Sequence, residues 1–103
     1  MSTYAWIITE DHIASDGEPE GTNGNAVGVA GPHDAAQEQI DRAKEEGRKF
    51  RMLDDDAILY YEGRIWAETE GSEDDFGPLW DFGEPNAGAV VIQYRLDGKW
   101  VTL

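Results

Sequence analysis

The sequence predicts an α+β fold, in which one helix packs on an antiparallel sheet of about five to six strands, as a single domain over residues 1–103. Short runs of alternating apolar side chains recur along the chain, which is typical of half-buried strands. Only the segment 31–47 has the period of an amphipathic helix. A length of 103 residues is near the commonest domain size, and an apolar fraction of 40% is enough for one core.

The N-terminal part predicts two strands separated by a loop. TYAWIIT, 3–9, places Trp6 and Ile8 on the same side of an extended chain. Residues 10–25 combine five acids with three glycines and one proline, which is typical of a loop. AVGVA, 26–30, then predicts a short return strand, which its glycine weakens.

The predicted helix lies within 31–47. Asp34 is the predicted N-cap, because Gln37 follows three residues later in the spacing of a capping box. Gly47 is placed to end the helix. A narrow stripe of alanines together with Ile40 forms the apolar face, which we expect to lie close against the sheet.

Two hairpins are predicted after the helix. RKFRMLD and AILYYEG flank Asp54, Asp55 and Asp56, whose side chains can accept hydrogen bonds from nearby backbone N–H groups and so favour a turn. RIWAE, 64–68, either continues the second strand or forms another. Within 90–103, Asp97-Gly98 separates two alternating runs and predicts a type I′ turn.

The segment 69–89 predicts a long ordered loop. It contains glycines and two prolines without a clear period. We expect the loop to be held by apolar anchors, which are Phe76, Leu79, Trp80 and Phe82.

The charge indicates the class of partner. Twenty-two acidic and eight basic residues give a net charge of −14, which repels nucleic-acid phosphates and anionic lipids and attracts basic surfaces. We therefore expect a basic protein surface as partner, and neither direct nucleic-acid binding nor a membrane. A homodimer is a further assembly that the sequence allows. Five of the eight basic residues fall within 42–51, so the negative field is uneven.

The acids give two interpretations. If the acidic loops meet on one surface, they form a large acidic face of the kind that a nucleic-acid-binding groove attracts. Otherwise they are separate solvated loops. The first interpretation predicts a partner-binding set that consists of Asp54, Asp55, Asp56, Glu68, Glu70, Glu73, Asp74 and Asp75.

No catalytic motif is present, so we expect no enzyme activity and no cofactor. His12 and Asp11 stand near Ser15, but residues so close in sequence rarely form the geometry of a catalytic triad. The alternative function is a small metal-dependent ligand-binding protein or enzyme that uses His12, Asp11 and the three aspartates. The aspartates lack the ligand spacing of an EF-hand. A third interpretation is a generic structural interaction domain.

The compartment is predicted from what the chain contains. Cysteine is absent, which suits a reducing cytoplasm. The N-terminal segment lacks the pattern of a signal peptide, and no apolar run approaches the roughly 20 residues of a membrane span. We expect a cytoplasmic protein.

Four segments carry a resemblance to a known group: YAWIITEDH, GPHDA, FRMLDDDAILYYEGR and PLWDFGEPNAG. Together they resemble a group of small uncharacterised acidic proteins found in bacteria and their phages. The resemblance covers most of the chain and implies a setting near mobile elements. With the charge, it implies an anti-defence role of the DNA-mimic type, such as anti-CRISPR or anti-restriction. The function we expect is a non-enzymatic binding protein that covers a basic nucleic-acid-binding surface.

Overall fold

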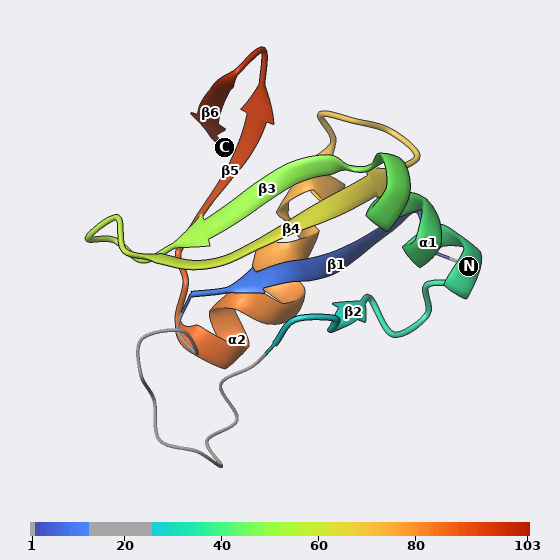
Figure 1. Ribbon diagram of the computed structural model, residues 1–103, viewed down its shortest axis with the longest axis horizontal. Helices are drawn as coiled ribbons and strands as arrows, with labels where there is room; N and C mark the ends of the chain where they lie inside the picture. The colour runs from blue at the N-terminus through green and yellow to red at the C-terminus, as the bar shows by residue number, and fades with distance from the viewer. Residues whose placement is uncertain (1, 13–25) are drawn as a thin grey trace.

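The fold is an open antiparallel sheet with helices. The computed structural model describes residues 2–12 and 26–103, so most of the predicted loop 10–25 lies outside the described residues. Within them, the six strands have the order β2-β1-β4-β3-β5-β6 (Figure 1). The strands are β1 (Tyr4–Asp11), β2 (Ala30–Gly31), β3 (Arg48–Leu53), β4 (Leu59–Ala67), β5 (Val91–Leu96) and β6 (Lys99–Thr102). The predicted class and the antiparallel sheet are confirmed.

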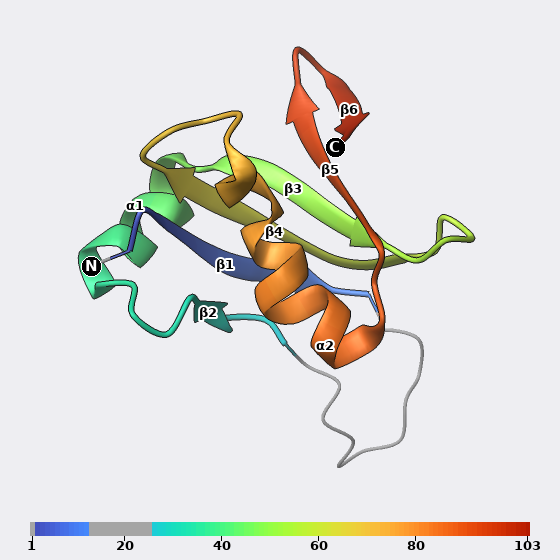
Figure 2. The same cartoon turned by 180° about the vertical axis from the view of Figure 1, so that it is seen from behind.

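The prediction of a single helix is wrong. Besides α1 (Gln37–Glu46), the chain forms η1 (Glu73–Phe76), the π-helical η2 (Leu79–Gly83) and α2 (Glu84–Ala87). These three elements run in succession across one face of the sheet (Figure 2). The stretch predicted to be an ordered loop is therefore a second helical layer.

The glycines and prolines of this segment, which predicted a loop, are explained by close packing and by their positions at the helix starts. A Cβ on Gly77 would lie 2.3 Å from the ring of Tyr4, and one on Gly83 would lie 2.5 Å from Sδ of Met52. The glycines therefore allow the helices to approach the sheet rather than ending them. Pro78 immediately precedes η2, and Pro85 lies in the first turn of α2, where a missing N–H costs little.

The core lies between the sheet and this helical layer. Trp6 and Ile65 are buried on the covered face, as are Phe50 and Tyr94 in the neighbouring strands. Phe82 of η2 packs on this face, with its ring centroid 5.6 Å from that of Trp6. Leu79 is also buried there, so the predicted role of these apolar residues as anchors is confirmed for this pair.

The first helix differs in detail from its prediction. Its N-cap is Ala36 rather than Asp34, and the Gln39 side chain accepts a hydrogen bond from the Ala36 N–H at 2.9 Å. The helix packs on β1 and β4 through the buried residues Gln39 and Ala43, while Ile40 is only half-buried. A glutamine that reaches both the helix start and the chain at Ser2 replaces the predicted cap.

The hairpins follow their predictions closely. β4 extends through Ala67, so RIWAE continues the second strand of the first hairpin. In the second hairpin, Asp97 and Gly98 have φ values of 51° and 80°, as the type I′ turn requires. The return strand before the helix is shorter than predicted, since β2 contains only Ala30 and Gly31.

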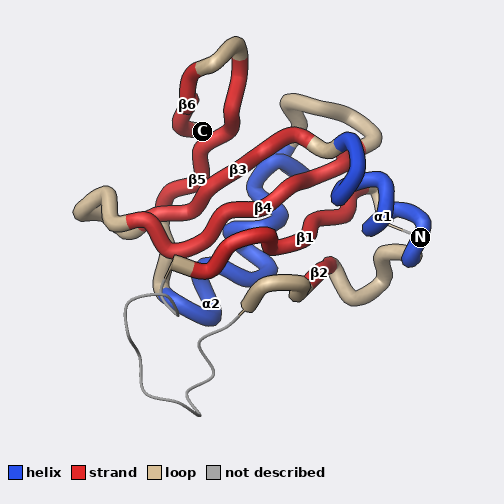
Figure 3. The backbone as a smooth tube through the Cα atoms, in the orientation of Figure 1, coloured by secondary structure: helices blue, strands red, loops and turns tan. Residues whose placement is uncertain are grey.

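The other face of the sheet is polar and carries much of the positive charge. In an antiparallel ladder, directly paired residues lie on the same face. Lys49 pairs with Arg64, and Arg51 and Arg95 alternate with buried residues of β3 and β5. We name Lys49, Arg51, Arg64 and Arg95 the basic sheet face. Figure 3 shows this face in front, with the helical layer of residues 73–87 behind the sheet.

The first hairpin turn provides a test of the backbone geometry. Ala57 has φ of 63°, a left-handed conformation that disfavours residues with a Cβ. We predict that Ala57→Gly raises the free energy of unfolding by about 1 kcal/mol, measured by urea denaturation. Ala67→Gly in β4 is the control and should lower it by about 0.5–1 kcal/mol. Equal destabilisation by both variants would contradict the prediction.

Candidate functional site

The predicted partner-binding acids lie in two groups at opposite ends of β4. Asp54, Asp55 and Asp56 form the turn that precedes this strand, and the other five follow it (Figure 1). β4 contains nine residues, which span roughly 30 Å in a strand. The structure therefore does not bring the two groups together.

The aspartates before β4 form a turn, as predicted. The Asp54 carboxylate accepts hydrogen bonds from the N–H groups of Asp56 at 2.8 Å and Ile58 at 2.9 Å. Asp54 is half-buried, whereas Asp55 and Asp56 are exposed. Asp54 therefore shapes the turn, and its two neighbours present negative charge at the tip.

Asp75 has an internal role rather than the predicted contact with a partner. Its side chain is buried and bonds Arg48 twice, at 2.7 Å from Nη2 and 3.2 Å from Nη1. It also accepts the Gly71 N–H, while its backbone carbonyl accepts the Tyr94 hydroxyl at 2.6 Å. Burial alone would lower the pKa of Arg48, but the hydrogen bonds and charge of Asp75 raise it. Asp75 is thus a structural anchor of η1.

The other predicted acids after β4 are at the surface. Glu68, Glu70 and Glu73 are exposed, and Asp74 is half-buried with its carboxylate accepting the Thr3 hydroxyl at 2.8 Å. We name residues 68–84 the acidic segment. It crosses the helix-covered side of the sheet (Figure 2).

Two further acids in this segment were missing from the sequence-based set. Asp81 is exposed and accepts hydrogen bonds from the Tyr4 hydroxyl at 2.5 Å and from Nε1 of Trp6 at 3.1 Å. Partial burial, and then the Asp81 and Asp74 carboxylates, raise the pKa of Tyr4. Both carboxylates therefore lie near the start of β1. Glu84, at the start of α2, is exposed as well.

Trp80 is the large apolar side chain of the acidic segment that faces solvent. It is 55% exposed and stacks on Phe76, with ring centroids 5.1 Å apart and an interplanar angle of 11°. Of the four predicted apolar anchors, Trp80 is therefore held only by its stacking on Phe76 and faces solvent, whereas Leu79 is buried. Leu79, Phe82 and Gly83 have the spacing of one helical face, so this pattern could have placed Trp80 on the opposite face.

The two sides of the sheet carry different charge. Residues 65–94 contain seven acids and no Lys, Arg or His. Four of the eight basic residues are on the basic sheet face, together with Glu10 and Glu62, and Arg48 is engaged by Asp75 and lies 3.7 Å from Glu70. The acidic segment is thus a surface of one sign.

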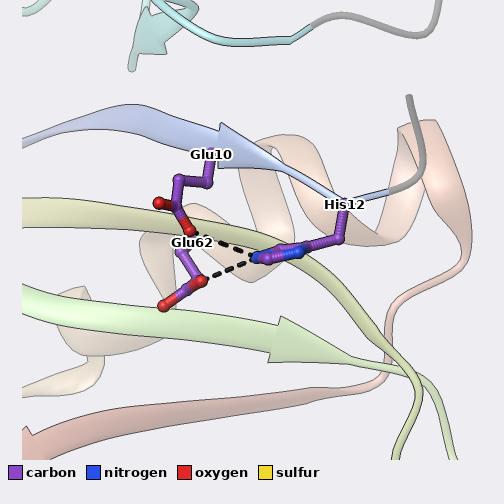
Figure 4. A group of neighbouring side chains, drawn as sticks. All are labelled: Glu10, His12 and Glu62. Atoms are coloured by element: carbon purple, nitrogen blue, oxygen red, sulfur yellow. Dashed lines mark hydrogen bonds and ion pairs between the residues drawn. The ribbon is translucent and has the colours of Figure 1, made fainter. Parts of the chain in front are cut away.

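His12 lies in a separate cluster at the end of β1 (Figure 4). Its Nε2 atom is 2.6 Å from Oε2 of Glu62 and 3.4 Å from Oε2 of Glu10. A hydrogen bond with Glu62 raises the pKa of Glu10. Burial would raise the pKa of Glu62, but hydrogen bonds with Glu10 and His12 lower it.

Asp11 lies on the other face of β1, where it pairs with Tyr61 and accepts the Ala26 N–H at 2.7 Å. The predicted alternative that joins His12, Asp11 and the three aspartates in one site therefore lacks a common location. Ser15 lies outside the described residues.

Comparisons with protein-family models, curated proteins and solved structures found no match to this chain. In the part of the chain that the structure describes, no helix has the length and apolar character needed to cross a membrane.

The buried ion pair provides the next test. Asp75→Asn removes the buried carboxylate that bonds the Arg48 guanidinium twice and leaves only the exposed Glu70, whose Oε1 lies 3.7 Å from Nε of Arg48. We predict a loss of about 3–5 kcal/mol in the free energy of unfolding, measured by chemical denaturation. Asp74→Asn, which alters an exposed hydrogen bond to Thr3, should cost less than about 1 kcal/mol. Similar losses in the two variants would show that Asp75 is not the anchor of η1.

Proposed function

We propose that the protein is a non-enzymatic acidic binding protein that covers a basic, nucleic-acid-binding surface of a partner protein. This is the mode of DNA-mimic proteins in anti-defence systems of the anti-CRISPR or anti-restriction type. The observation that carries the proposal is the segregation of charge, with the acidic segment on one side of the sheet and the basic sheet face on the other. We place this activity in the cytoplasm, where nucleic-acid-binding partners are found.

The segregated charge supports binding through one side. A partner charged to hold phosphates attracts Glu68, Glu70 and Glu73, and no basic side chain within 65–94 offsets this attraction. The basic sheet face repels the same partner. At physiological salt, charges are screened over about 8 Å, so the attraction to the partner comes mainly from the side of the protein that faces it.

Trp80 supplies the apolar part of the proposed interface. Exposed Trp side chains often contribute most to the affinity of protein interfaces when they become desolvated. Its stacking on Phe76 holds the indole in place before a partner arrives, which reduces the ordering cost of binding.

The aspartates of the first hairpin provide a second contact in this proposal. An interface of ordinary size buries about 800 Å² on each partner. A partner surface that reaches both Glu68 and Asp55 must extend over the roughly 30 Å of β4, which is a length that nucleic-acid-binding grooves provide. The acidic segment is the primary contact, because it contains more acids and the exposed indole.

Charge reversal tests the primary contact. The protein is immobilised and presented with purified bacterial DNA-binding proteins, and those that it retains are challenged with duplex DNA. We predict that a bound partner is displaced by the DNA. The triple variant Glu68→Lys, Glu73→Lys, Glu84→Lys, which leaves Glu70 in its ion pair with Arg48, should lower the association rate about ten-fold or more, with a smaller effect at high salt.

The matched control applies the same charge change to α1 through Glu38→Lys, Asp41→Lys and Glu45→Lys, which are all exposed. This control should retain most of the affinity. Equal losses in both variants, or a partner that duplex DNA does not displace, would show that the charge serves solubility or a generic interaction.

The aspartates and Trp80 are tested separately in the same assay. Changing Asp54, Asp55 and Asp56 to Asn keeps a side-chain acceptor for the turn, so stability should hold while the association rate falls moderately. Trp80→Ala should act mainly on the dissociation rate. An unfolded triple-Asn variant would contradict the placement of these charges at a solvent-exposed tip.

A further inference from the structure

The strongest unexplained feature outside the acidic segment is the cluster of Glu10, His12 and Glu62. One ligand atom from each of the three lies within 4.8 Å of the others. Glu10 and Glu62 lie on the adjacent strands β1 and β4, His12 directly follows β1, and the three side chains converge on one point (Figure 4). We propose that these three residues bind a zinc-type divalent cation on the open face of the sheet.

A bulge in β1 creates the cluster. Ile8 pairs with Gly63, and Glu10 pairs with Glu62, so Thr9 is an extra residue between the two pairs. Without the bulge, the alternation of Trp6 and Ile8 would carry Glu10 onto the covered face. The bulge instead places it on the open face, directly opposite Glu62.

Two glutamates directly opposite each other in a ladder repel each other when both are ionised. The nearest arginine of the neighbouring strand, Arg51, pairs with Glu62 in the ladder. Its guanidinium is instead directed toward β5 and β6, where Nε donates to Gln93 at 2.7 Å and the group stacks on Trp100 at 4.3 Å. A bound cation would place a positive charge directly between the two carboxylates.

The donor set and its spacing fit zinc. Zinc takes imidazole nitrogen and carboxylate oxygen at about 2.0–2.2 Å, so neighbouring donors in a tetrahedral site are roughly 3.4 Å apart. The distance of 3.4 Å from Nε2 of His12 to Glu10 already has this value, and the 2.6 Å distance to Glu62 requires only that the Glu62 side chain move outward. Glu62 is partly exposed, so its side chain has room to make this adjustment.

The position of the cluster favours an open coordination site. Three protein donors leave a fourth position for water or for a group from another molecule. Glu10 is 61% exposed on its side chain, so that position faces solvent. The cluster offers one imidazole nitrogen and only two carboxylates, which disfavours calcium, an ion that takes six to eight oxygen ligands, relative to zinc. Lys49 and Arg64 line the adjoining depression with Thr9.

The sequence alone does not show this site, because Glu62 is fifty residues from His12 and reaches it only through the pairing of β1 with β4. The aspartates at 54–56 form a second close group of carboxylates. We do not propose a zinc site there, because these residues offer no nitrogen donor and the Asp54 carboxylate already accepts a backbone N–H of the turn.

Zinc titration of the full chain tests the proposal. Protein freed of metal with a chelator is titrated with zinc chloride by calorimetry, and we expect one site per chain and a rise in the melting temperature. Glu10→Gln and His12→Asn should each weaken zinc binding about ten-fold or more. Glu45→Gln removes the same charge from the exposed side of α1 and should leave the zinc affinity unchanged.

Nuclear magnetic resonance of the histidine rings gives an independent readout. The chain contains only His12 and His33, so a His33→Asn variant assigns both signals. Zinc should shift the His12 ring nitrogens at one equivalent and leave those of His33 in place. Zinc binding that is absent, or that is unaffected by both Glu10→Gln and His12→Asn, overturns the proposal. Because Glu10 is exposed, Glu10→Gln keeps the test valid if His12→Asn fails to fold.

Discussion

The buried contact between Arg48 and Asp75 determines how the helical layer is placed on the sheet. Arg48 begins β3, and its guanidinium stacks on the Tyr94 ring at 4.8 Å. Asp75 belongs to η1, so the ion pair joins the first turn of the helical layer to the centre of the sheet. Since η2 and α2 follow without interruption, their position over the core depends on this contact. The surface that carries Trp80 and the acids of the acidic segment is therefore presented by an internal charge pair.

The strands were readily predicted from the sequence, because alternation and turn chemistry act locally. Asp97-Gly98 adopts the positive φ values that its composition indicates, and Asp54 accepts the backbone N–H groups that favour a turn. The helical layer was missed for a non-local reason. In the sequence, Gly77 and Gly83 resemble helix breaks. In the structure they leave room for the side chains of Tyr4 and Met52, which are far away in sequence.

For the candidate site, the sequence predicted the acidic composition of the segment but not the positions of its individual side chains. The sequence shows that 65–94 lacks basic residues, yet charge counting cannot separate a surface acid such as Glu73 from the buried Asp75. Arg48 is distant in sequence, so nothing local indicates its pairing. Likewise, a single extra residue at Thr9 decides which face Glu10 occupies, and a bulge of this kind leaves no clear pattern in the sequence.

The segregation of charge across the sheet also gives the molecule an electric dipole. A molecule with net charge alone is pulled toward an oppositely charged surface in any orientation, whereas a dipole also experiences a torque. In the field of a positively charged body, the acidic segment turns toward that body while Arg51 and Arg95 turn away. Rotation thus precedes contact, and a larger share of encounters begins with the same side of the protein.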